Sequence, residues 1–156
     1  MATAPYPTDH PIHRPRDRRH GTHPIHGILA AYPLALFTAA FATDIAYANT
    51  AEMQWANFSI WLIAGGLLGG VLAAIAGIVD AVANRNRDHP RRRRSSAHNL
   101  ATIFMLAFAL VNAFVHSRDA WTSVVPAGII ISGIVTVLAL VTAWLGYSLE
   151  ARQEDY

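Results

Sequence analysis

Four long apolar stretches constrain the fold of this chain more than any other feature. They cover about residues 26–47, 57–83, 98–117 and 124–149, and each is bare of charge through its middle. An apolar stretch of about 20 residues spans the hydrocarbon core of a membrane as a helix, because backbone groups in lipid need partners within their own segment. The sequence therefore predicts an all-α integral membrane protein. A soluble bundle would need polar stripes along its helices, and these stretches lack them.

The apolar stretches also predict the domain organisation. Residues 22–150 form the four-helix transmembrane domain, and short connections within the first and last pairs of helices favour an up-and-down bundle. Residues 1–21 are expected to be a disordered basic tail, and residues 151–156 a short C-terminal tail. The first stretch could be taken for a secretory signal because "AYA" at 46–48 resembles a cleavage site. The stretch and its lead are longer than in such signals, so we expect it to be retained.

The arginines predict how the bundle is oriented in the membrane. All twelve basic residues are arginine, and all but Arg118 lie before the first helix, between the second and third, or after the fourth. Basic residues mark the cytoplasmic side, so both termini and the central loop are expected to be cytoplasmic. The run at 91–94 is expected to attract anionic lipid headgroups at that surface. We do not expect nucleic acid as a partner.

One group of ionisable residues is predicted at the cytoplasmic leaflet. His23 and His26 lie at the start of the first helix and, three residues apart, share one face of it. Asp80 ends the second helix on the same side, and His98 opens the third. Ionisable groups within membrane spans tend to face partners or pathways, so this group is a candidate site.

A sparser group is predicted at the outer side: Asp44, Asn112, His116 and Arg118. His26 precedes Asp44 by 18 residues and His98 precedes His116 by 18, which is about five turns at 3.6 residues per turn. Each of the two helices therefore carries a stripe with a polar group at both ends. In the third helix the stripe passes Thr102, Met105, Ala109 and Asn112.

The cytoplasmic histidines suggest a haem. In an up-and-down bundle the first and third helices lie diagonally across the core, which suits His26 and His98 as axial ligands of one haem b. The glycines of the second helix could leave room for the ring, and His23 and Asp80 would orient the two ligands. On this interpretation the protein transfers electrons.

Three other interpretations stay open. His23, His26, His98 and Asp80 together would suit zinc or copper. The same groups could relay protons. Alternatively, the polar residues only lock the helices together in a non-catalytic accessory or assembly subunit.

Several activities are excluded by what the sequence lacks. Cysteine is absent, which excludes disulfides, thiolate nucleophiles and cysteine-ligated iron–sulfur clusters held by this chain alone. No nucleophilic triad, phosphate loop or hydrolytic carboxylate pair is recognisable, so nothing indicates a hydrolase or transferase. We do not expect the chain to be an enzyme by itself.

A set of motifs in fixed order resembles a known family. The segments are "HPIHGILAAYPLALFTAAFATD", "GIVD", "RRRRSSAHNLATIFMLAFALVNAFVHSRD" and "TAWLGYSL". Over about residues 22–150 they resemble the bacterial four-helix membrane proteins called domain of unknown function 2231. The positions that match are His23, Pro24, His26, Pro33, Asp44, Gly77, Asp80, His98, Arg118, Trp144 and Gly146. The chain departs from the pattern at Gly27 and Ala143, and it lacks the histidine-bearing tail after the fourth helix.

The resemblance implies a multi-pass protein of the bacterial inner membrane. The family is distantly similar to the cytochrome b-type four-helix superfamily, and some relatives are joined to Rieske-type iron–sulfur domains. Both features favour electron transfer, with a redox partner or a larger membrane complex. The outer side offers His116 alone, so we expect one haem at most.

Overall fold

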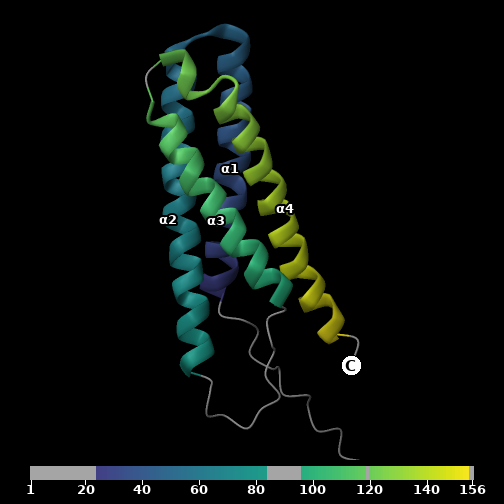
Figure 1. The fold of residues 1–156 in the computed structure, drawn as a ribbon. Coiled ribbons are helices and arrows are strands. Elements are labelled where there is room, and N and C mark those ends of the chain that lie inside the picture. The colour runs from purple at the N-terminus through teal and green to yellow at the C-terminus, as the bar shows by residue number, and fades with distance from the viewer. Residues whose placement is uncertain (1–23, 84–95, 119, 155–156) are drawn as a thin grey trace, which may run out of the picture.

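The computed structural model describes residues 24–83, 96–118 and 120–154, and these form a four-helix bundle (Figure 1). The helices are α1 (Pro24–Thr50), α2 (Met53–Ala83), α3 (Ser96–His116) and α4 (Ala127–Glu154), with a short 3₁₀ helix, η1 (Ala120–Ser123), before α4. No strand occurs in this part of the chain. The predicted all-α fold is confirmed.

The helices run up and down, so each lies beside two others. Both α1 and α3 pack mainly against α2 and α4, which places α1 and α3 on a diagonal of the bundle. The start of α1 and the end of α4 lie at one end of the bundle, here called the terminal end (Figure 1). The α1–α2 connection and η1 lie at the other, here called the turn end.

The α1–α2 connection is only two residues long, Ala51 and Glu52, where the sequence suggested about ten. Ala51 adopts a left-handed conformation with φ of 56°, and its N–H donates to Tyr47 O at 2.8 Å. This arrangement closes the last turn of α1, and glycine is the residue that usually makes it. Because the turn is so tight, residues equally far from it in α1 and α2 lie at equal depth.

Glycines of α2 bring that helix close to its neighbours. A Cβ at Gly66 would lie 2.5 Å from Phe37 Cε1, and one at Gly69 would lie 2.6 Å from Tyr32 Cδ1. Small residues allow such close helix packing in membranes. Below the turn end, the core consists of buried apolar side chains: Phe37, Met105, Ala109, Val135 and Ala139.

The outer surface suits a lipid environment. Three helices, α2, α3 and α4, are long and apolar enough to cross a membrane. Large apolar side chains point outward, such as Trp61, which is 77% exposed, and Phe114, which is 67% exposed. The first predicted span, α1, is 27 residues long.

Candidate functional site: a buried aspartate–histidine pair at the turn end

Asp44 lies at the centre of a polar cluster to which all four helices contribute. It is on α1, six residues before the end of that helix, and it is 0% exposed. Ser59 of α2 donates to Asp44 Oδ1, and Ser132 of α4 donates to Asp44 Oδ2. His116 of α3 reaches across the diagonal, with Nε2 at 2.9 Å from Asp44 Oδ1. One carboxyl group therefore bonds with the three other helices.

The hydrogen bonds of His116 determine how many protons the pair holds. Nδ1 lies 3.0 Å from the carbonyl oxygen of Asn112, and a carbonyl only accepts, so Nδ1 carries a hydrogen. The contact between Nε2 and Asp44 Oδ1 needs one further hydrogen, on either atom. With it on Nε2 the pair is imidazolium and carboxylate, and with it on Oδ1 both groups are neutral. In both states the net charge of the pair is zero.

The position of His116 depends on a glycine of α4. A Cβ at Gly128 would lie 2.9 Å from His116 Cε1 and 2.6 Å from Ser123 O. The ring and the last residue of η1 therefore both press against the same point of α4. Only a residue without a side chain leaves space for them there.

The cluster continues along hydrogen bonds from the neighbouring turns. Asn112 Nδ2 donates to Ser132 Oγ at 2.8 Å, which leaves the serine hydrogen to point at Asp44. Thr43 Oγ1 lies 2.7 Å from Ser59 Oγ. Asn112 is 1% exposed, and its Oδ1 has no hydrogen-bond partner.

Of the predicted outer group, the structure brings three members together. Asp44, Asn112 and His116 share the cluster, whereas Arg118 is exposed just after α3. The predicted stripe on α3 faces the core, since Met105, Ala109, Asn112 and His116 are all buried.

The predicted cytoplasmic group falls largely outside the described residues. That holds for His23 and for the side chains of His26 and Asp80. His98 is half-buried at the start of α3, with Nδ1 at 3.1 Å from Thr142 O and its ring against Gly146 of α4. Among the residues the structure describes, no three histidine, cysteine or acidic side chains are grouped to hold a metal ion.

The expectation that the glycines of α2 leave room for a ring is wrong for the middle of that helix. The space beside Gly65, Gly66, Gly69 and Gly70 is filled by Leu36, Phe37, Tyr32 and Leu106. These glycines serve helix packing, mostly against α1.

Sequence reasoning missed two members of the cluster, Ser59 and Ser132. Neither serine stands out in the sequence, because small polar residues are common in membrane spans. The helix ends in the structure place all three residues, Asp44 and the two serines, at a similar depth. Asp44 is six residues before the end of α1, Ser59 is six after the start of α2, and Ser132 is five after the start of α4.

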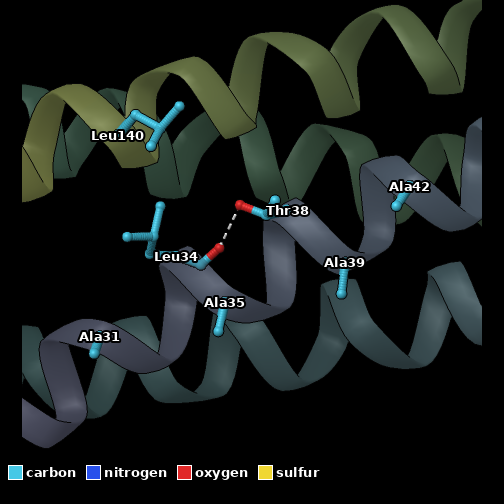
Figure 2. A pocket seen from close by; sticks show the side chains of 7 residues that line it. All are labelled: Ala31, Leu34, Ala35, Thr38, Ala39, Ala42 and Leu140. Carbon is cyan, nitrogen blue, oxygen red and sulfur yellow. Dashed lines mark hydrogen bonds between the residues drawn. The ribbon is translucent and has the colours of Figure 1, made fainter.

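An open groove between α1 and α4 faces outward beside the core (Figure 2). It is lined by Ala31, Leu34, Ala35, Thr38, Ala39, Ala42 and Leu140. Its one side-chain polar group, the Thr38 hydroxyl, donates to Leu34 O at 2.7 Å within α1. The groove thus presents an apolar surface suited to lipid chains, and it carries none of the chemistry of the cluster.

Comparison with known sequences places the chain in a family. The profile of the family described as "Predicted membrane protein (DUF2231)" matches residues 22–154. The chain belongs to this family. Neither a curated protein nor a solved structure matches it. The DUF2231 family is thus a membrane family whose name assigns no activity, and the proposals for this member start from its own residues.

Proposed function

We propose that this DUF2231 protein is a proton-binding membrane protein rather than an enzyme, and that the Asp44–His116 pair is its proton site. The observation that carries the proposal is the 2.9 Å contact between these two buried groups from diagonal helices. Ionisable residues inside membrane spans are costly and tend to be retained for function.

Gain or loss of a proton at this pair changes the charge inside the bundle. Loss leaves a lone carboxylate, and gain leaves a lone imidazolium beside a neutral carboxyl group. A buried unpaired charge costs several kcal/mol, so either change favours rearrangement of the groups around it. Because Ser59 and Ser132 also bind Asp44, rearrangement reaches all four helices. Proton occupancy is thereby coupled to helix packing.

Infrared difference spectroscopy in mild detergent tests the proton site. We expect a pH-dependent carboxyl band that disappears in Asp44→Asn and persists in Glu52→Gln, a matched change at an exposed carboxylate. The ¹⁵N resonances of His116 should change over the same pH range. If neither group changes its protonation while the protein stays folded, the proton proposal fails, and the polar cluster is only a lock between helices.

The membrane orientation is proposed from the arginines, with both termini and the central loop in the cytoplasm of a bacterial cell. Anionic headgroups would bind the arginine run at 91–94. The absence of cysteine makes the test direct, because single cysteines label without background. In spheroplasts an impermeant maleimide should label Glu52→Cys and spare Gln153→Cys. The reverse pattern would place the terminal end outside.

A second candidate function, electron transfer through haem b, rests on His98. A histidine ligand commonly donates its other ring nitrogen to a backbone carbonyl, which fixes the ring, and His98 Nδ1 has such a contact with Thr142 O. His26 would be the opposite ligand, with His23 and Asp80 orienting the two. A haem would supply one-electron chemistry to a redox partner.

Reduced-minus-oxidised visible spectra of the purified protein test this candidate. A haem band that disappears in both His26→Ala and His98→Ala, and persists in His116→Ala, would support it. Colourless protein with stoichiometric zinc or copper would favour the metal alternative. Protein with neither haem nor metal would remove both.

A further inference from the structure

The proton site lies much closer to one end of the bundle than to the other. Asp44 is six residues from the end of α1 and 20 from its start. At 1.5 Å per residue these separations are about 9 Å and about 30 Å. His116 is the last residue of α3. The turn end is therefore the nearer source of water.

The longer route, toward the terminal end, is closed by apolar packing. Phe37, Met105, Ala109, Val135 and Ala139 fill the core beneath the pair. The buried hydroxyls next to this layer, those of Thr136 and Thr142, donate to backbone carbonyl oxygens: Thr136 to Ser132 O at 2.9 Å or Phe37 O at 3.2 Å, and Thr142 to Leu138 O at 2.8 Å. A proton crossing the apolar side chains between such groups would have no hydrogen-bond partner there, which is costly in an apolar medium.

The shorter route is closed by a thin cover. Tyr47, one turn beyond Asp44, is 2% exposed, and Val124, just after η1, is 0% exposed. Ser123 O lies against the point of Gly128 that His116 Cε1 also contacts. The cover is thus a four-residue 3₁₀ helix and the residue after it. Such short segments have poorer hydrogen-bond geometry than α-helices.

We propose that the Asp44–His116 pair exchanges its proton with only one aqueous compartment, the one at the turn end, and that η1 with Val124 is the cover that moves to admit water. This inference rests on the proposed function. The inference adds that the proton site exchanges with the water on one side of the membrane only, and therefore responds to the pH on that side.

Among the described residues, no second buried charged side chain lies beside the pair. On α1 the nearest titratable side chain is the buried Tyr47. On α2 the side chain that contacts the pair is Ser59, and on α4 it is Ser132. Glu52 in the turn and Arg118 after α3 are exposed. Asp119 lies outside the described residues.

Reconstitution into vesicles tests the direction of access. Full-length protein is inserted in separated populations of known orientation, assigned by labelling Gln153→Cys. The internal pH is held by an impermeant buffer while the external pH is changed. We expect the carboxyl band that disappears in Asp44→Asn to respond when the turn end faces outward and to stay constant when the terminal end does.

The outcomes separate this inference from the proposed function. A response from the terminal end, from both ends or from neither, with a pair that titrates in detergent, overturns one-sided access and leaves the proton site standing. A pair that does not titrate in detergent overturns both.

A variant of the cover gives a second readout. Val124→Ala should make the carboxyl band respond several-fold faster when the pH changes at the turn end. A pH change at the terminal end should still produce no response. The matched control is Val111→Ala, an outward-facing valine of α3 that is 52% exposed, and it should leave the rate unchanged. Equal rates in Val124→Ala and the native protein would exclude Val124 from the cover.

Discussion

At the scale of single residues, Asp44 is the side chain whose burial depends most on its hydrogen-bond partners. It is fully buried, and its two oxygens form hydrogen bonds with Ser59, His116 and Ser132. A buried carboxylate without such donors would carry a large desolvation penalty. The sequence marked this residue because an acid inside an apolar stretch is rare. It also placed His116 in the same outer group, but it did not identify Ser59 and Ser132, which come from two further helices.

Replacing Asp44 should destabilise the protein strongly. In Asp44→Asn an amide NH₂ group replaces one of the two carboxyl oxygens, and His116 loses its carboxyl partner. Removing one member of a buried pair costs about 3–5 kcal/mol, so we expect a loss of that order in the free energy of unfolding. Glu52→Gln at the exposed turn should change it by no more than about 0.5 kcal/mol. Reversible unfolding in detergent measures both, and equal effects would contradict a special role for Asp44.

Gly128 should tolerate a methyl group far less well than Gly146. A Cβ at Gly128 meets Ser123 O and His116 Cε1 within 3 Å, whereas at Gly146 its nearest neighbour is His98 Cε1 at 3.6 Å. Overpacking costs about 1–3 kcal/mol, and an unhindered Gly→Ala change in a helix gains up to about 1 kcal/mol. Gly128→Ala should therefore destabilise the protein and shift the His116 ¹⁵N resonances. Gly146→Ala should be neutral or stabilising, and the opposite order would contradict the packing described for His116.

At the scale of elements, the sequence predicted all four helices, with the end of α2 at Ala83 and the other helix ends differing by up to five residues. Apolar length is a property of each segment alone, so it located the spans. Helix ends depend on turn geometry, and nothing in "NTAEM" signalled that Ala51 would take a left-handed conformation where glycine is usual. Because the tight turn at Ala51 was not predicted, the sequence did not show that Asp44 and Ser59 lie at equal depth. Stripe positions on α3 were predictable because 3.6-residue periodicity is local.

Ala51→Gly should stabilise the protein. The left-handed conformation costs a residue with a Cβ about 1–2 kcal/mol, part of which is offset by the greater freedom of glycine in the unfolded chain. We expect a net gain of about 0.5–1 kcal/mol in the free energy of unfolding. The matched control is Ala48→Gly, one turn earlier on the exposed face of α1, which should lose about 1 kcal/mol. A loss in both variants would show that the turn does not hold this conformation in the membrane protein.

At the scale of the whole molecule, the bundle consists of two hairpins joined by the polar cluster. The α1–α2 pair is closely packed through the glycines of α2, and α3 with α4 forms the second pair. Between the hairpins, Asp44 binds His116 and Ser132. Its bond to Ser59, by contrast, lies within the first hairpin. The cluster therefore contains contacts between the hairpins and a contact within one hairpin, and different substitutions remove each kind.

Splitting the chain within residues 84–95 and co-expressing the halves exploits this difference. Helices in membranes associate through packing and interhelical hydrogen bonds, so the halves should co-purify. Asp44→Asn removes the carboxyl contacts with His116 and Ser132 between the hairpins and should lower recovery of the complex about tenfold or more, since tenfold in an equilibrium corresponds to about 1.4 kcal/mol. Ser59→Ala removes a bond within one hairpin and should leave recovery within about threefold of the native pair. Equal losses in the two variants would mean that the apolar faces alone join the hairpins, and that the Asp44–His116 pair contributes nothing to their assembly.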